Sequence, residues 1–230
     1  MSIPLLPARP VGFPDPRGAM TQPDGLLAAG GDLTSEWLIE AYAQGIFPWF
    51  DSDDDHILWW SPGTRAVSVP GEIKVSRSLA KRIRNGGFEV RADSDFAGVI
   101  EGCRQPRAAS QGTWITDSMT DAYMGLHEAG VAHSVETYLD GRLVGGLYGV
   151  SLGLCFFGES MFSAEPDASK IAFHALHRQL QAWDFLLIDC QIQNPHLKTL
   201  GVKEISRADF LAILTKNPLR KTRTGLWQLG

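Results

Sequence analysis

The sequence has few cysteines, no long apolar run and no excess of positive charge. Its three cysteines (Cys103, Cys155 and Cys190) lack the paired spacing of zinc ligands, so we expect reduced thiols and no metal site. No segment reaches the roughly 18 apolar residues that a bilayer-spanning helix needs. The proline-rich start, MSIPLLPARPVGFPDP, does not resemble a signal peptide, and we therefore expect a cytoplasmic protein.

The composition is that of an ordinary globular protein. The 230 residues are 44% hydrophobic and 20% charged, which allows a sizeable core. The formal net charge of -5 provides no overall attraction for nucleic acid, so any contact with RNA must come from a local basic patch.

The order of helical and strand patterns predicts an α+β protein. Proline, glycine and aromatic residues dominate the start, and a change of composition near Pro62 predicts a small N-terminal α+β domain over 1–62 and a second domain over 63–230. Capping residues and apolar spacing predict helices over 34–45, 76–86, 93–103, 116–130, 167–183 and 206–214. Alternating strands surround a hairpin turn at Asp140-Gly141, and FLLIDCQI is typical of a strand buried on both faces.

Antiparallel hairpins, then a helix, then a buried strand is the order found in acyl-CoA N-acetyltransferases. We therefore expect an acetyltransferase-like (GNAT-type) second domain with a mixed, mostly antiparallel sheet. Those enzymes bind the CoA pyrophosphate at a glycine-rich turn before the helix. The equivalent segment here, SAEPDASK, has no glycine and two carboxylates, which indicates an acyl donor other than CoA.

Two catalytic or metal-binding patterns are incomplete. Gly149 to Gly153 has the spacing of a nucleophile elbow around Ser151, and Asp189 and His196 follow in hydrolase order. The next residues predict another strand rather than the required helix, so we expect a turn there, with a serine hydrolase as an alternative function. The acidic run at 51–55 lacks the glycine and glutamate of a calcium loop, and a solvated turn is expected.

Ten segments in order resemble the leucyl/phenylalanyl-tRNA–protein transferases. They are GLLAAGGDL, AYAQGIFPWF, ILWWSP, GTWIT, LHEAGVAHSVE, GGLYG, GESMFS, ASK, IDCQ and NPHLKTLG, and they span nearly the whole chain. The resemblance implies transfer of Leu, Phe or Met from aminoacyl-tRNA to proteins that begin with Arg or Lys, which marks those proteins for degradation. It implies no cofactor, since the aminoacyl ester is already activated.

The resemblance also implies roles for polar residues near the end of the buried strand. Asp189 and Gln191 are two residues apart, so we expect their side chains to share one face. Asp189 would assist deprotonation of the attacking amine, and Gln191 would orient it or polarise the carbonyl. Two alternatives are that Asp189 only satisfies buried backbone groups and that the ribose hydroxyl of the tRNA relays the proton. Glu159 would pair with the basic acceptor residue, the alternative being an internal salt bridge.

The remaining expected site residues bind the donor. An apolar pocket for the donor side chain is expected from Leu147, Phe156, Met161 and Ile188. Stacking on the terminal adenosine is expected from Trp49 and Trp114, with Tyr42 and Asn194 completing that site. A basic stripe on one helix face, expected to bind the tRNA acceptor stem, consists of Arg77, Lys81 and Arg84. Each of these residues could instead be ordinary core or solvated surface, and a non-catalytic binder of basic N-termini would need only Glu159.

Overall fold

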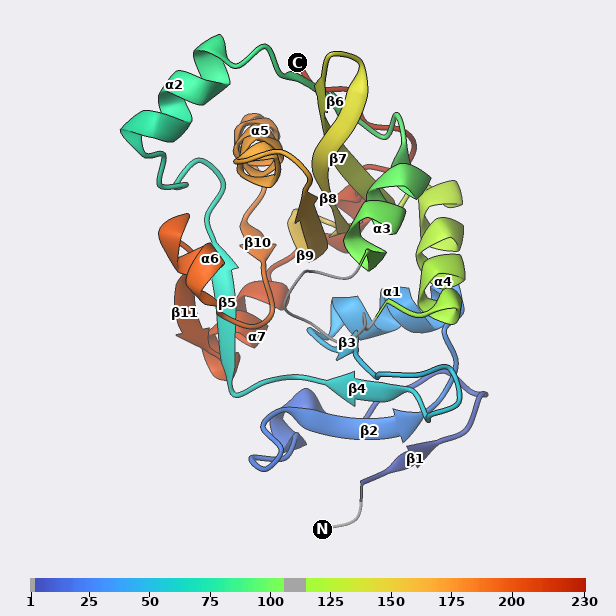
Figure 1. Cartoon of the computed structure of the whole chain (residues 1–230). Helices are drawn as coiled ribbons and strands as arrows, with labels where there is room; N and C mark the ends of the chain where they lie inside the picture. Colours follow the sequence, from blue (N-terminus) through green and yellow to red (C-terminus); the bar gives the residue numbers. More distant parts are fainter. Residues whose placement is uncertain (1–2, 106–114) are drawn as a thin grey trace.

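The computed structural model describes residues 3–105 and 115–230, which form two β-sheets with helices packed between and around them (Figure 1). The smaller sheet has the order β1-β2-β4-β3 and consists of β1 (Leu5–Leu6), β2 (Leu26–Gly30), β3 (Phe47–Pro48) and β4 (Leu58–Trp60). The larger sheet has the order β11-β5-β10-β9-β8-β7-β6. Its strands are β5 (Thr64–Ser68), β6 (Glu89–Ala92), β7 (Ala132–Leu139), β8 (Arg142–Leu152), β9 (Cys155–Ser163), β10 (Leu187–Asp189) and β11 (Lys203–Ser206).

Six of the described α-helices begin and end close to the predicted positions, and the short helix α6 was not predicted. They are α1 (Ser35–Ala43), α2 (Arg77–Asn85), α3 (Phe96–Arg104), α4 (Asp117–Glu128), α5 (Ala168–Ala182), α6 (Pro195–Thr199) and α7 (Arg207–Leu214), with 3-10 turns η1 (Pro16–Gly18) and η2 (Leu219–Lys221). The side chains of Ser76, Thr116 and Ser206 each accept a hydrogen bond from a backbone N–H in the first turn of the helix that follows. These contacts satisfy backbone donors that have no partner within the helix.

The large sheet is mixed and mostly antiparallel, as predicted. Among its described strands, only β9 and β10 pair in parallel, and the other neighbours are antiparallel. Asp140 and Gly141 connect β7 to β8 with φ values of 51° and 74°, the left-handed geometry of the predicted tight hairpin. In the chain, α5 follows β9 and precedes β10, and these two strands pair in parallel. This order confirms the predicted α+β class with an acetyltransferase-like arrangement of elements.

Alternation along the central strands sends neighbouring side chains to opposite faces of the large sheet. Leu147 and Phe156 pack in one core cluster with Phe173 of α5. Their neighbours Tyr148 and Phe157 pack in the other cluster, which contains buried residues of α1, α3 and α4. The large sheet therefore has α5 packed on one face. On the other face lies a core layer that connects the sheet to the N-terminal elements.

Strands β9 and β10 pair only over a short distance and then diverge. Leu187 to Asp189 lie opposite Cys155 to Phe157. Beyond these pairs β9 continues to Ser163, while the segment that follows β10 turns away from it. Gln191 has a left-handed φ of 52°, which ends the extended conformation. The strand predicted from FLLIDCQI is therefore shorter than expected, and the separation leaves space beside β9.

The turn predicted over Gly149 to Gly153 is wrong. Residues up to Leu152 belong to β8, and only Gly153, with φ of 61°, lies in the tight connection to β9. The difference arises because Gly149 to Leu152 all pair with β9, and Gly149 and Val150 also pair with β7, so these residues form the end of a buried strand rather than a bend. Among the described residues, no helix is long and apolar enough to cross a membrane.

Candidate active site

A cavity of about 1090 Å³ occupies the space where β9 and β10 diverge. One wall is apolar and includes all four residues predicted for the donor side chain, Leu147, Phe156, Met161 and Ile188. Phe173 and Leu176 of α5 complete this wall, although their spacing in the sequence predicts only a core stripe. Such a wall favours a large apolar group over a small one, since each buried CH₂ contributes about 0.8 kcal/mol.

Glu159 enters the cavity from an irregularity in the pairing of β8 with β9. Tyr148 lies opposite Ser160 and Gly149 lies opposite Gly158, so Glu159 is the extra residue of a β-bulge. A bulge bends the strand locally and redirects a side chain. Here it leaves the carboxylate partly buried and lining the cavity.

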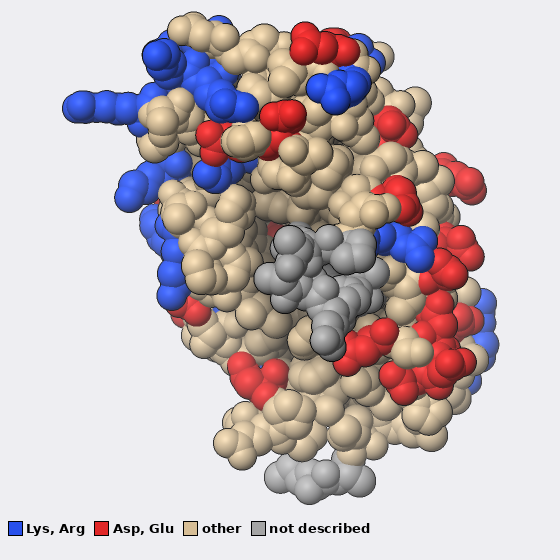
Figure 2. All heavy atoms as spheres, viewed as in Figure 1, with Lys and Arg blue, Asp and Glu red and all other residues tan. Residues whose placement is uncertain are grey.

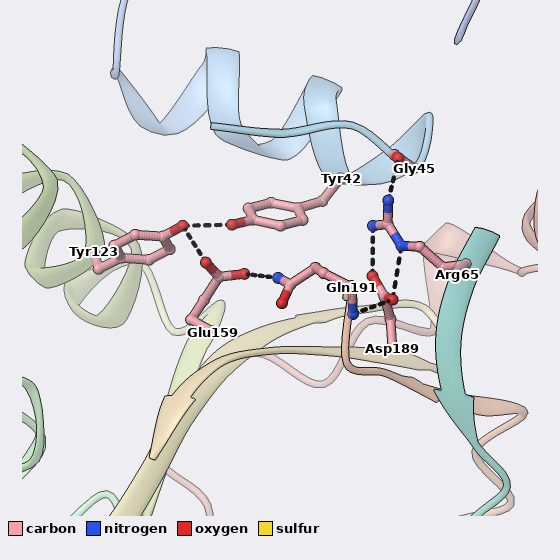
Figure 3. A network of polar contacts seen from close by, with 7 residues as sticks. All are labelled: Tyr42, Gly45, Arg65, Tyr123, Glu159, Asp189 and Gln191. Carbon is pink, nitrogen blue, oxygen red and sulfur yellow. Dashed lines mark hydrogen bonds and ion pairs between the residues drawn. The ribbon is translucent and has the colours of Figure 1, made fainter. Parts of the chain in front are cut away.

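The carboxylate of Glu159 is held by two donors from distant parts of the chain (Figure 3). The phenol of Tyr123 donates to Oε2 at 2.7 Å, and Nε2 of Gln191 donates to Oε1 at 2.7 Å. Tyr123 also shares a short hydrogen bond with the hydroxyl of Tyr42. Burial raises the pKa of Glu159 from 4.5 to about 7, and the hydrogen bonds from the tyrosines oppose that shift. Glu159 can thus change its charge near neutral pH.

Asp189 is fully buried and bound to Arg65, which is 1% exposed. Its two carboxylate oxygens accept hydrogen bonds from Nε and Nη2 of Arg65, at 2.8 and 2.6 Å (Figure 3). The guanidinium also donates to the carbonyl of Gly45, and its carbon lies 4.8 and 4.5 Å from the ring centroids of Phe47 and Phe210. This is a bidentate, desolvated ion pair of the type that fixes geometry strongly.

The expectation that the side chains of Asp189 and Gln191 share one face is wrong. Because Gln191 is left-handed, its side chain turns to Glu159, while its backbone N–H donates to Oδ1 of Asp189 at 2.9 Å. Gln191 lines the cavity, and Asp189 is not among the lining residues. The structure therefore joins the two residues through the backbone and places only the amide at the cavity.

The residues predicted for the donor adenosine occupy different positions. Trp49 is 40% exposed and lies on the cavity rim. Asn194 also lines the cavity, and its side chain caps α6 by accepting from the N–H of Leu197. Tyr42 is fully buried behind Tyr123 and is not among the lining residues. Trp114 lies outside the described residues.

The predicted basic stripe forms an exposed face of α2. Arg77, Lys81 and Arg84 are all exposed, while Leu79 of the same helix is buried. Figure 2 shows Lys and Arg side chains gathered at the upper left, over the position of α2 in Figure 1. The molecule thus carries a local positive patch despite its negative net charge.

Ser151 does not lie in a nucleophile elbow. It is fully buried within β8, and its hydroxyl has no hydrogen-bond partner in the described part of the chain. A serine nucleophile needs an exposed oxygen next to a base. The geometry therefore gives the hydrolase alternative no support.

Sequence reasoning missed the partners that hold the two carboxylates. Arg65 lies in a strand 124 residues before Asp189, and Tyr123 lies in a helix 36 residues before Glu159. Neither residue belongs to a recognisable short motif. An internal arginine in the otherwise uncharged strand segment 64–68 was the one available signal, because arginine is seldom buried without a charged partner.

The comparisons with known proteins agree over most of the chain. The family model described as leucyl/phenylalanyl-tRNA protein transferase matches residues 67–215, and the model of its N-terminal domain matches residues 31–63. The leucyl/phenylalanyl-tRNA–protein transferase of Thiobacillus denitrificans is 56% identical over 89% of both chains, and that of Pseudomonas fluorescens is 54% identical over 94% of both.

Among solved structures, L-PGS from Bacillus licheniformis is a remote match, with a TM-score of 0.40 and 12% identity over 70% of this chain and 52% of that one. The family models cover the elements that form the cavity, the two held carboxylates and α2. On this evidence the chain belongs to the leucyl/phenylalanyl-tRNA–protein transferase family.

Proposed function

We propose that this chain transfers Leu, Phe or Met from aminoacyl-tRNA to the N-terminal Arg or Lys of acceptor proteins, marking them for degradation. The observation that carries the proposal is the pairing of an apolar wall with a carboxylate in one cavity. The apolar wall suits the donor side chain, and Glu159 suits a cationic acceptor side chain. The reaction would take place in the cytoplasm.

The chemistry requires little beyond positioning, because the aminoacyl ester is already activated. The α-amine of the acceptor attacks the ester carbonyl carbon and forms the new C–N bond. The C–O bond to the ribose then breaks, and the ribose oxygen takes up the proton that the amine loses. Holding two reactants in register can contribute about 7–11 kcal/mol to lowering such a barrier.

Gln191 is the group best placed to act on the reacting atoms. Its amide lines the cavity beside Glu159. The amide N–H and C=O groups that Glu159 does not use would orient the amine or polarise the carbonyl. Asp189 acts through Gln191 in this proposal, since it holds the backbone of Gln191 and is itself bound to Arg65. Its role is therefore positioning, and the proton leaves the amine through the ribose hydroxyl or solvent.

Donor selection follows from the apolar wall and the rim. Leu has three more carbons than Ala, which corresponds to roughly 2–2.5 kcal/mol of preference at about 0.8 kcal/mol per CH₂. Such a margin discriminates by tens of fold and admits several large side chains. Trp49 on the rim would stack on the terminal adenosine together with Trp114, and Asn194 would complete that contact. Tyr42 would contribute through its bond to Tyr123.

The exposed basic face of α2 would bind the acceptor stem of the donor tRNA through phosphate contacts. We also propose that residues 1–62 and 63–230 are the two domains of the protein. The first contains the small sheet and α1, and the second contains the large sheet.

The test is incubation of the protein with radiolabelled leucyl-tRNA and a peptide that begins with Arg. Transfer of label to the peptide supports the proposed function. Label that stays on tRNA while the peptide binds indicates a non-catalytic binder of basic N-termini, and label released as free leucine indicates a hydrolase. A peptide of the same sequence that begins with Ala is the matched control and should receive little label.

A further inference from the structure

The segment that follows η2, residues 222–230, is bound to distant parts of the chain. Oγ1 of Thr222 accepts a hydrogen bond from the N–H of Gly153 at 2.7 Å. At the other end, the N–H of Gly230 donates to the side-chain oxygen of Gln179 at 2.9 Å. The segment is thus held at both ends, and the residues between these contacts pass along the α5 side of the large sheet.

Trp227 is the buried anchor of this segment. It is 4% exposed and belongs to the core cluster that contains the apolar wall of the cavity. Its backbone N–H donates to Oδ2 of Asp93 at 2.6 Å, and its ring stacks on His133, with centroids 3.9 Å apart and planes 10° apart. Nδ1 of His133 lies 2.8 Å from the same carboxylate oxygen, and Trp183 packs edge-on against the indole at 5.0 Å. These contacts leave the indole little freedom to move.

The ring of Trp227 backs one residue of the apolar wall. Its centroid lies 5.9 Å from that of Phe156, which lines the cavity. Trp227 itself is not among the lining residues, so it supports the wall from behind. The Phe156 ring also rests on Gly149, where an added Cβ atom would lie 2.7 Å from two of the ring carbons. The resting place of Phe156 is therefore set by the indole and by the backbone of β8.

The position of the Phe156 ring limits what the apolar wall can accommodate. Phe156 is 1% exposed, so there is little empty space beside its ring. A larger donor side chain must push the ring back toward Trp227. Protein cores contain few voids and transmit such a displacement to the next layer of side chains. The depth available to the donor thus depends on the indole behind the wall.

We propose that Trp227 is a positioning residue for donor selection, which sets the resting place of Phe156 and with it the largest donor side chain that the cavity accepts. The size of the indole carries this role, because its Nε1 has no hydrogen-bond partner in the described part of the chain. The inference rests on the proposed function, in which the apolar wall binds the donor side chain. It gives the C-terminal segment a part in the choice between leucyl and phenylalanyl donors.

The experiment replaces Trp227 by smaller apolar residues and measures donor preference. Trp227→Phe and Trp227→Leu keep the backbone N–H that binds Asp93 and leave a void that the Phe156 ring can enter. We expect the ratio of kcat/KM for phenylalanyl-tRNA to kcat/KM for leucyl-tRNA to rise about tenfold in Trp227→Leu, the effect of about one methylene of space in an apolar pocket. The ratio should rise less in Trp227→Phe, and the acceptor KM should stay unchanged in both. Trp227→Phe decides the question if Trp227→Leu does not fold.

A matched control separates this role from a loss of stability. Partial unfolding reduces transfer from both donors by the same factor and leaves their ratio constant. Trp37 is a fully buried tryptophan whose Nε1 donates to the carbonyl of Ala8 at 3.1 Å, and it does not line the cavity. Trp37→Phe should therefore lower the melting temperature without changing the donor ratio. A donor ratio that stays constant in both Trp227 variants, with only the melting temperature lowered, overturns the proposal.

A double variant tests whether Trp227 acts through Phe156. Phe156→Leu removes the ring that the indole supports, so Trp227→Phe should change the donor ratio less in that background than in wild type. Equal changes in the two backgrounds would assign the effect to another contact and overturn the proposal.

Calorimetric binding of amide-linked leucyl-adenosine and phenylalanyl-adenosine separates this inference from the proposed function, because neither analogue can transfer its amino acid. If wild type binds both analogues but transfers no label from tRNA, the proposed function fails, and a shift of relative affinity toward the phenylalanyl analogue in Trp227→Phe still supports the assignment. The same relative affinity in wild type and the Trp227 variants overturns it. Binding of neither analogue by folded wild type also overturns it, since the apolar wall then holds no donor side chain.

Discussion

Replacement of Asp189 by Asn tests whether this carboxylate positions the site or accepts a proton. The substitution keeps the size of the side chain and removes its charge, which leaves the guanidinium of Arg65 buried without a counter-charge. Both side chains are at most 1% exposed, so water cannot compensate. Removing one partner of a buried ion pair costs about 3–5 kcal/mol.

The expected loss of stability is large enough to measure easily. A protein of this size loses about 2–4 °C of melting temperature per kcal/mol, so Asp189→Asn should melt roughly 6–20 °C below wild type. The turn at Gln191 should loosen as well, because its backbone N–H donates to the carboxylate that is lost. We therefore expect slower transfer together with lower stability.

The double variant Arg65→Gln with Asp189→Asn distinguishes the two roles. It removes both charges, and a coupling of about 0.5–3 kcal/mol should make it more stable than the sum of the single changes. Transfer should recover in parallel if Asp189 only positions Gln191. Transfer should be measured with saturating leucyl-tRNA and Arg-initiated peptide at a temperature well below all melting transitions.

One result would refute this reasoning. Loss of a general base typically slows a reaction about 10²–10⁴-fold. If Asp189→Asn melts like wild type but loses transfer by that factor, and the double variant stays equally slow, Asp189 takes the proton itself.

Four further predictions concern charge and size. Because burial raises the pKa of Glu159 to about 7, kcat/KM for an Arg-initiated peptide should rise with pH through that value, and Glu159→Gln should raise the acceptor KM and abolish this step. Because the folded state binds the Glu159 proton more tightly than the unfolded state, this group stabilises the fold fully below pH 4.5, and the contribution is lost as pH rises through about 7. The melting temperature of wild type, measured against pH, should therefore fall relative to that of Glu159→Gln over this range. Met161→Ala shortens the apolar wall and should raise the KM for leucyl-tRNA roughly tenfold at about 0.8 kcal/mol per lost CH₂, with the acceptor KM unchanged. A variant with alanine at the three positions of the basic stripe on α2 should lower the log–log salt slope of the donor KM by about 2–3. The control Arg17→Ala in η1 should leave that slope constant. An unchanged slope in the triple variant would contradict tRNA binding by α2. Those three positions are Arg77, Lys81 and Arg84.

Local signals predicted much of the fold. Helix caps such as Ser76 and Thr116 act within one turn of the chain, and Asp140-Gly141 fixes its hairpin through its own left-handed conformation. The end of the buried strand was not predicted, because the left-handed turn at Gln191 depends on the carboxylate of Asp189 and the pairing with β5. A residue's conformation is hard to infer when its stabilising contacts come from distant segments.

In the candidate site too, local features were predicted and contacts between distant segments were not. The four residues expected to form the apolar donor pocket line one cavity, Leu147 from β8, Phe156 and Met161 from β9 and Ile188 from β10. The environment of each carboxylate did not follow, because Tyr123 and Arg65 reach Glu159 and Asp189 from separate elements. The sequence therefore indicates which groups lie at the cavity, and the tertiary contacts decide their charge and orientation.

The N-terminal segment takes part in holding both carboxylates, although the boundary near Pro62 is drawn by composition. Tyr42 in α1 bonds Tyr123, which holds Glu159. The carbonyl of Gly45, three residues later, accepts from Arg65, which holds Asp189. The end of α1 and the following turn thus support the acceptor carboxylate on one side and the positioning carboxylate on the other. A change that shifts α1 should therefore disturb both groups together, even though neither belongs to the first sixty residues.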